Sequence, residues 1–179
     1  MNLPNKLTLL RILLVPVFIA CFYIGVPWKL YLAGGVFFVA YLTDILDGQI
    51  ARKQKIVTDF GKLMDPIADK LLTASALVML VGEQMLAPVP AFIIIAREFI
   101  ISGFRLVSAG NGSVIAASWL GKTKTVTQCV AILFILFDDL IAKLIGFPLG
   151  TVVMWVSVFF TVWSGVDYIL KNKGAVSFR

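Results

Sequence analysis

The chain has 179 residues, of which 60% are hydrophobic and 15% are charged, and its formal net charge is +6. Soluble globular domains average about 45–50% apolar and about 25% charged residues, so the composition argues against a soluble domain and favours a membrane protein. The chain has no histidine and two well-separated cysteines, which excludes histidine-based metal sites and argues against a disulfide framework. No arginine-rich arm accompanies the positive charge, so we expect no nucleic-acid partner.

Six apolar stretches follow one another, separated by short polar breaks or breaks with glycine and proline. Crossing a bilayer takes about 20 apolar residues, and the backbone inside it has to satisfy its own hydrogen bonds. We therefore predict an all-α, polytopic membrane protein, a single domain over residues 1–179 that forms a bundle of six transmembrane helices. The predicted spans are residues 7–24, 30–51, 62–82, 88–108, 120–141 and 149–170.

The first residues, MNLPNKL, are predicted to form a short interfacial segment before the first span. No small-residue cleavage site follows them, so we do not interpret them as a cleaved signal. Asn5 precedes apolar residues and is a candidate N-cap, because its side chain can accept the first amide hydrogen bonds of a helix.

Lysine and arginine gather at both termini, between the second and third spans, and between the fourth and fifth. The opposite breaks hold only Lys29 and Lys143 as cations. Because cationic segments stay on the cytoplasmic side, both termini are predicted to face the cytoplasm from the cell membrane.

Four aspartates stand near the cytoplasmic ends of the second and third spans. Asp44 and Asp47 are three residues apart, and Asp65 and Asp69 are four apart, so each pair shares one helical face. The connecting segment is short, which predicts that the two helices are antiparallel neighbours with facing carboxylates. Carboxylates at contact distance repel one another, and bound Mg²⁺ or Mn²⁺ relieves that repulsion in an oxygen-rich site.

Two alternatives concern the same segment. In the first, the aspartates pair with nearby cations in a solvated network at the helix ends, for which the candidates are Arg52, Lys53, Lys62 and Lys70. The small residues beside them, Gly48, Ala51 and Gly61, leave room for a ligand, although close packing of two helices also requires small side chains.

The segment reads DILDGQIAR, eight further residues, and then GKLMDPIAD. This spacing resembles the signature of the CDP-alcohol phosphotransferases. The stretches NLPNKLTLLRILLVPVF, AREFIISGFR and SVIAASWLGKTKTVTQ resemble the branch of that family that uses glycerol 3-phosphate. The resemblance implies an enzyme that transfers phosphatidyl from CDP-diacylglycerol to sn-glycerol 3-phosphate and releases CMP. It also implies a homodimer surrounded by membrane lipids, with its active site on the cytoplasmic side.

The resemblance also implies roles for individual residues. Asp44, Asp47 and Asp65 take the place of metal ligands in a two-metal site, and Asp69 takes the place of the general base, which also touches a metal. The residues implied to bind CDP-diacylglycerol are Asn5, Thr8, Arg11, Gly48, Ala51, Arg52 and Gly61. For the first three of these, helix capping and contact with lipid headgroups is an equally good interpretation.

A phosphorylated acceptor needs cations. The candidates are Arg97, Arg105, Lys122 and Lys124. The two arginines are eight residues apart, which places them about two turns along one helical face. Anchoring at the cytoplasmic surface also accounts for the two lysines, and pairing with Glu98 or with another helix also accounts for Arg97.

Other functions remain open at this stage. Within the family, the alternative acceptors are inositol phosphate, phosphatidylglycerol and serine. Outside it, intramembrane aspartates also occur in transporters of divalent cations, and a scaffold without enzymatic activity is a third alternative.

Overall fold

The computed structural model describes residues 3–54, 59–111 and 119–175, and every regular element in these residues is helical, as predicted. The elements are α1 (Leu3–Tyr23), α2 (Lys29–Gln54), α3 (Asp59–Gly82), α4 (Pro88–Gly110), α5 (Trp119–Leu136), α6 (Asp138–Ile145), α7 (Leu149–Asn172) and the 3-10 turn η1 (Lys173–Ala175).

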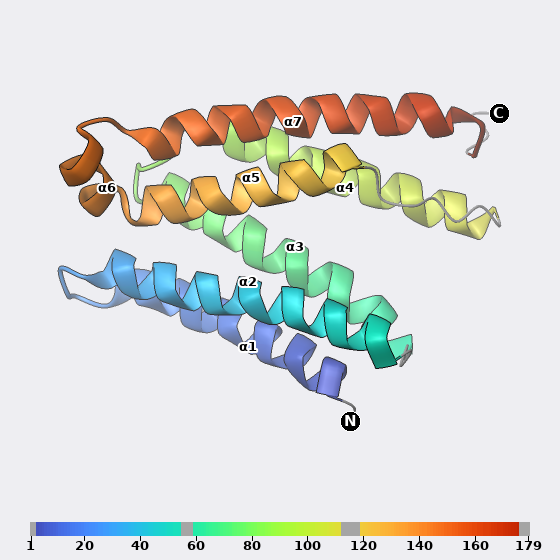
Figure 1. Ribbon diagram of the computed structural model, residues 1–179, viewed down its shortest axis with the longest axis horizontal. Helices are drawn as coiled ribbons and strands as arrows, with labels where there is room; N and C mark the ends of the chain where they lie inside the picture. Colours follow the sequence, from blue (N-terminus) through green and yellow to red (C-terminus); the bar gives the residue numbers. More distant parts are fainter. Residues whose placement is uncertain (1–2, 55–58, 112–118, 176–179) are drawn as a thin grey trace.

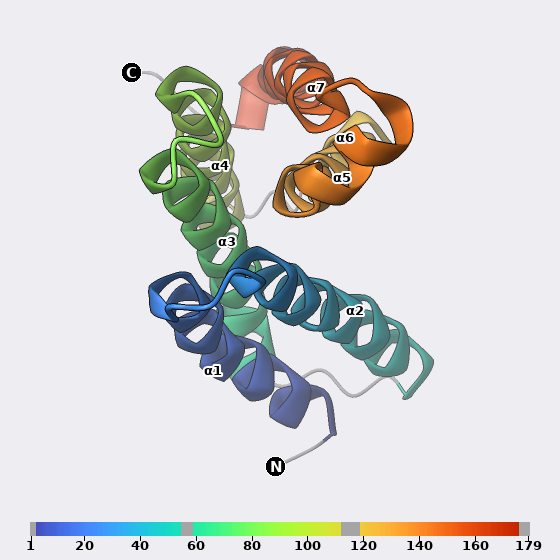
Figure 2. The same cartoon turned by 90° about the vertical axis from the view of Figure 1, so that its left-hand side faces the viewer.

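The long helices run roughly along one axis, and the two ends of the chain lie at the same end of the bundle (Figure 1). Helices α1, α2 and α3 pack together as one group, while α5 packs along α7 (Figure 2). Helix α4 joins the groups, because it contacts both α3 and α7. Further contacts of α5 with α2 and α3 bring four helices, α2 to α5, around one central region.

Two details of the predicted helices are wrong. The fifth stretch is not one helix: α5 ends at Leu136 and α6 begins at Asp138. Asp138 and Asp139 occupy the first turn of α6, where a carboxylate is favoured by the partial positive charge of a helix N-terminus. The predicted interfacial segment at the N-terminus is not separate from the first span, because α1 continues without a break from Leu3. Asn5 therefore lies inside the helix and is not its N-cap.

Large apolar side chains cover much of the exterior of the bundle, while a few charged side chains lie inside its mostly apolar core. Its exterior carries large apolar side chains such as Phe92, Phe99 and Leu106 of α4, each at least 69% exposed. Arg11 and Lys124 are buried inside. A large apolar exterior is expected where the surroundings are lipid.

Among the described helices, two are long and apolar enough to cross a membrane, namely Asn5–Tyr23 of α1 and Leu149–Asn172 of α7. Together with the apolar exterior, these helices indicate a membrane protein. The described helices α2 to α5 carry charged side chains within their length, several of which face the interior. Their place in the bilayer, and with it the six-span arrangement, stays a prediction.

Gly150 marks a close approach between α5 and α7. A Cβ atom there would lie 2.8 Å from Cγ1 and 2.9 Å from the backbone nitrogen of Ile135. Backbone atoms cannot move aside as the end of a flexible side chain can. The absence of a side chain at Gly150 therefore allows the two helices to pack at this distance.

We expect Gly150→Ala to lower the free energy of unfolding by about 1–3 kcal/mol, because the added methyl group forces α5 and α7 apart. The midpoint of thermal unfolding in detergent measures this loss. Gly103→Ala in α4 is the matched control, since a Cβ there meets nothing within 4 Å. The control should be neutral or slightly stabilising, because alanine favours a helix over glycine. Equal midpoints for the two variants would contradict the prediction.

Candidate active site

A polar cavity of about 500 Å³ lies where α2, α3, α4 and α5 meet. Three carboxylates line it, each from a different helix: Asp44 of α2, Asp69 of α3 and Glu98 of α4. Four cations line it as well, namely Lys70 of α3, Arg97 and Arg105 of α4, and Lys122 of α5. Residues that the sequence assigned to a metal site and to an acceptor phosphate therefore share one cavity.

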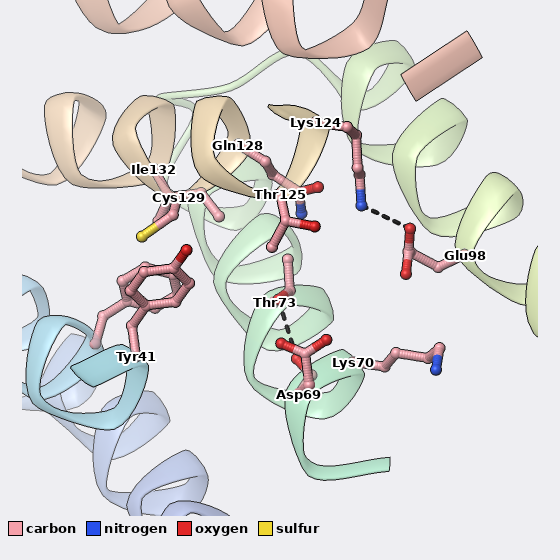
Figure 3. A pocket seen from close by; sticks show the side chains of 11 residues that line it. Tyr41, Asp69, Lys70, Thr73, Glu98, Lys124, Thr125, Gln128, Cys129 and Ile132 are labelled. Carbon is pink, nitrogen blue, oxygen red and sulfur yellow. Dashed lines mark hydrogen bonds and ion pairs between the residues drawn. The ribbon is translucent and has the colours of Figure 1, made fainter. Parts of the chain in front are cut away.

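A narrower pocket, with a volume of about 30 Å³, adjoins this cavity. Tyr41, Asp69, Lys70, Glu98 and Thr125 line both. Figure 3 shows side chains of α2, α3, α4 and α5 converging on this inner pocket. Lys124 is buried and lines the inner pocket but not the larger cavity, so it lies deeper than Arg97, Arg105 and Lys122.

Arg11 of α1 is fully buried, and its Nη1 lies 2.8 Å from Oδ1 of Asp44. The structure thus pairs a residue assigned to the nucleotide with one assigned to a metal. The network of aspartates and cations considered from the sequence is present for Asp44, and one of its partners, Arg11, comes from α1. Asp44 keeps 37% of its side chain exposed and lines the cavity while it is held in this pair.

Asp69 lies among charges of both signs. The carboxylates of Asp44 and Glu98 repel its charge, whereas Lys124 and Arg11 attract it. Its backbone carbonyl accepts a hydrogen bond of 3.0 Å from the hydroxyl of Thr73, one turn later in α3. A carboxylate in this setting can exchange a proton with a bound hydroxyl group.

Glu98 binds two cations through the same oxygen. Its Oε1 lies 2.6 Å from Nζ of Lys124 and 2.8 Å from Nη1 of Arg97. Arg97 also donates from Nη2 to the Ser164 hydroxyl of α7, at 3.1 Å. Gly165 leaves the space for this contact, because a Cβ there would lie 3.2 Å from Cγ of Arg97. Both sequence-based alternatives for Arg97, pairing with Glu98 and with another helix, are therefore present.

Arg105 and Lys122 are held differently. The Nε of Arg105 donates to the Tyr168 hydroxyl at 3.1 Å, and its guanidinium lies 5.2 Å from the centre of that ring. The Nζ of Lys122 lies 5.9 Å from the centre of the Trp119 ring. Neither cation forms an ion pair with a carboxylate in the described part of the chain. No described carboxylate therefore offsets the positive charges of Arg105 and Lys122, and both side chains are available to an anion in the cavity.

Several predicted site residues lie elsewhere. Thr8 is buried on α1 three residues before Arg11, and Asn5 is partly buried a further turn back. Neither lines the two pockets described above. The remaining residues belong to α2 or α3 by their backbone, but their side chains lie outside the described part of the structure; they are Asp47, Gly48, Ala51, Arg52, Gly61 and Asp65.

The residues present fit a divalent cation. Asp44 and Asp69 face one cavity from neighbouring helices, and carboxylate oxygens are the ligands that Mg²⁺ and Mn²⁺ prefer. Among the described residues no three potential ligands lie together. The other two aspartates of the motif, Asp47 and Asp65, are outside that search.

Sequence reasoning missed several side chains of the site. Tyr41, Thr73 and Gln128 line the inner pocket, and Tyr168 of α7 supports Arg105. Gln128 follows Lys124 by four residues, so helical spacing alone places it on the same face of α5. Nothing in the sequence indicates that α7 packs against α4, which is why Ser164 and Tyr168 were not found.

A helical membrane protein whose cavity joins carboxylates with cations is suited to chemistry on phosphate esters. The sequence profile of the CDP-alcohol phosphatidyltransferases matches residues 1–163, and the chain belongs to this family. The resemblance inferred from the aspartate motif is thereby confirmed.

Three relatives that align over nearly the whole chain share one enzyme name. The chain is 44% identical to the CDP-diacylglycerol–glycerol-3-phosphate 3-phosphatidyltransferase of Bacillus subtilis strain 168, over 98% of this chain and 97% of the relative. It is 40% identical to the protein of the same name from Rickettsia bellii, over 96% of each chain. The protein of that name from Haemophilus influenzae is 36% identical, over 98% of this chain and 95% of the relative.

We expect Glu98→Gln to lower the free energy of unfolding by roughly 3 kcal/mol, because the variant leaves two buried cations without a carboxylate. Thermal unfolding in detergent measures the change. Glu83→Gln is the matched control. Glu83 pairs with Lys29, and 29% of the Glu83 side chain and 28% of the Lys29 side chain are exposed. Loss of that more exposed pair should cost about 1 kcal/mol or less. The prediction fails if the control loses as much stability as Glu98→Gln.

Proposed function

We propose that the chain is an integral membrane phosphatidylglycerophosphate synthase. It transfers the phosphatidyl group of CDP-diacylglycerol to sn-glycerol 3-phosphate, and gives phosphatidylglycerophosphate and CMP for phospholipid biosynthesis. The observation that carries the proposal is the cavity in which Asp44 and Asp69 face Arg105 and Lys122. Membership of the family and three full-length relatives of that enzyme name support it.

The acceptor phosphate binds to the cations of the large cavity. Arg105 and Lys122 are the main partners, since no carboxylate of the described part pairs with them. Arg97 and Lys124 share the charge of Glu98, so they contribute less positive potential to the same region. An arginine can bind two phosphate oxygens at once, which orients the acceptor as well as holding it.

The donor lipid lies beside the cavity. An apolar pocket of about 400 Å³ between α3 and α4 is lined by Leu71, Leu77 and Phe99, among others. It shares Lys70, Glu98 and Ser102 with the polar cavity. An acyl chain in this pocket places the donor's phosphates near Asp44 and Asp69. The nucleotide extends toward Arg11 and toward Gly48, Ala51 and Arg52 of the aspartate motif.

Transfer proceeds by displacement at the phosphorus that carries the diacylglycerol. Asp69 accepts the proton of the acceptor's primary hydroxyl while its oxygen forms a bond to that phosphorus. The pyrophosphate P–O bond breaks, and CMP leaves with the bonding electrons. Because a loose phosphoryl transition state needs little covalent help, the cavity acts mainly by positioning the two substrates and by its fixed charges.

Asp44 and Asp69, together with Asp47 and Asp65 of the same motif, would hold Mg²⁺ or Mn²⁺ in a two-metal site. When bound, such ions neutralise the pyrophosphate and stabilise the negative charge on the departing CMP oxygen. Arg11 holds Asp44 in place at the cavity wall through their 2.8 Å ion pair.

The proposal includes a multi-pass arrangement in the cell membrane, with the active site and both termini on the cytoplasmic side, where a soluble acceptor can reach it. It also includes a homodimer. The outer face of α7, with Trp155, Phe159 and Trp163 each at least 49% exposed, is apolar enough to face lipid or a second copy. The domain extends over residues 1–179.

One observation argues against transport of divalent cations as the function. The cavity that holds the two aspartates also holds Arg97, Arg105 and Lys122, whose charges repel a passing cation. The same cations favour a phosphorylated acceptor over serine. Inositol phosphate and phosphatidylglycerol are separated from glycerol 3-phosphate by supplying each of them in the assay.

We expect Asp69→Asn to lower the rate of CMP release by roughly 100-fold or more, because an amide cannot accept the hydroxyl proton. The assay uses purified protein in detergent with CDP-diacylglycerol, glycerol 3-phosphate and Mg²⁺ or Mn²⁺. Asp167→Asn is the matched control, since Asp167 pairs with Lys171 on α7 away from the cavity. The control should keep the parent rate. Turnover close to that of the parent in Asp69→Asn would remove Asp69 from the mechanism.

We expect Arg105→Ala and Lys122→Ala to raise the KM for glycerol 3-phosphate by about 10-fold or more, because each removes one charge-assisted contact to phosphate. The KM for CDP-diacylglycerol should stay unchanged, which serves as an internal control in the same steady-state measurement. Lys143→Ala on α6, a lysine outside both pockets, should change neither constant. A rise in the donor's KM alone would place these cations on the nucleotide instead.

A further inference from the structure

Gln128 of α5 is a buried amide without a partner. The residue is 2% exposed, and neither Oε1 nor Nε2 has a hydrogen-bond partner among the described residues. A buried polar group without a hydrogen bond is costly, and an amide offers both an acceptor and two donors. The side chain is therefore suited to bind a small polar group that reaches the inner pocket.

The inner pocket sets the size of that group. Gln128 lines it together with Asp69, Thr73 and Lys124. Figure 3 shows Gln128 and Lys124 projecting from α5 on the side that faces Asp69 and Thr73 of α3. A volume of about 30 Å³ is enough for a hydroxyl group or a water molecule.

The proposed acceptor presents three polar groups, and two of them already have partners. Its phosphate binds to Arg105 and Lys122 in the large cavity, and its primary hydroxyl lies at Asp69. The secondary hydroxyl, on the carbon next to the primary one, remains. This hydroxyl group is uncharged, as the Gln128 amide is. Asp69 lines both the inner pocket and the large cavity, so an acceptor whose primary hydroxyl lies at Asp69 has its secondary hydroxyl next to the inner pocket.

We propose that Gln128 is a specificity-determining residue that binds the secondary hydroxyl of the acceptor inside the inner pocket. This assignment rests on the proposed function. Either orientation of the amide completes the bond, because its oxygen accepts a hydrogen bond from the hydroxyl group and its NH₂ group donates one to the hydroxyl oxygen. The bond selects an acceptor with adjacent hydroxyl groups over one with the primary hydroxyl alone.

The experiment compares two acceptors on the same protein preparation: glycerol 3-phosphate and propane-1,3-diol monophosphate, which lacks the secondary hydroxyl. The parent chain should prefer glycerol 3-phosphate in kcat/KM by about 10- to 100-fold, the size expected when a buried polar group is left without its partner. Gln128→Met keeps the side-chain volume and removes the hydrogen bonds. It should reduce the preference to below about 3-fold, by lowering kcat/KM for glycerol 3-phosphate alone.

Ser157→Ala is the matched control. Ser157 is also buried and without a partner in the described part, but it belongs to α7 and lines neither pocket. Its loss should leave the acceptor preference unchanged. A ratio between two acceptors does not depend on the fraction of protein that is folded, so poor folding of Gln128→Met does not hide the result.

Two outcomes would overturn the inference alone: equal losses for both acceptors in Gln128→Met, or a parent chain that turns over both acceptors equally well. A different result would overturn the proposed function and the inference with it. In that case the parent chain releases no CMP with either acceptor, although CDP-diacylglycerol and the metal are present.

Discussion

Arg11 is fully buried inside an apolar bundle, and the carboxylate of Asp44 lies 2.8 Å from it. Removing a charge from water costs several kcal/mol unless an opposite charge is close. The same constraint acts at Glu98, which faces Lys124 and Arg97. Two ion pairs between helices, Arg11 with Asp44 and Lys124 with Glu98, therefore hold these charged residues. This compensation fixes α1 against α2, and α5 against α4, around the cavity where phosphate chemistry is proposed.

Much of the helical framework could be predicted from the sequence, because apolar length and polar breaks mark where each helix begins and ends. The break between α5 and α6 was not predicted, since Phe137 continues the apolar pattern and only the aspartates after it indicate a new helix. Spacing also brought Arg97 and Arg105 to one face of α4, where the structure has both lining the cavity. The spacing of residues, however, indicates only which side chains share a face of one helix, and not which helices are in contact.

The contacts between helices could not be derived in that way. The partner of Asp44 is Arg11, 33 positions earlier in the chain, and Arg97 and Arg105 are held by Ser164 and Tyr168, more than 60 positions later. Gln128 was not predicted for another reason: it carries no charge, and its interest lies in the hydrogen-bond partners that it lacks among the described residues. Asp47 and Asp65, the other half of the motif, stay predictions.

Gly165 has a wider consequence. By leaving space for Arg97, and with Ser164 and Tyr168 beside it, the last part of α7 orients two of the cations proposed for the acceptor. These three residues follow residue 163, where the match to the family profile ends. Two cations proposed for the acceptor are thus positioned by α7, whereas the aspartate motif lies on α2 and α3. Substitutions at these positions of α7 are therefore a way to alter the placement of the proposed acceptor while the aspartate motif stays as it is.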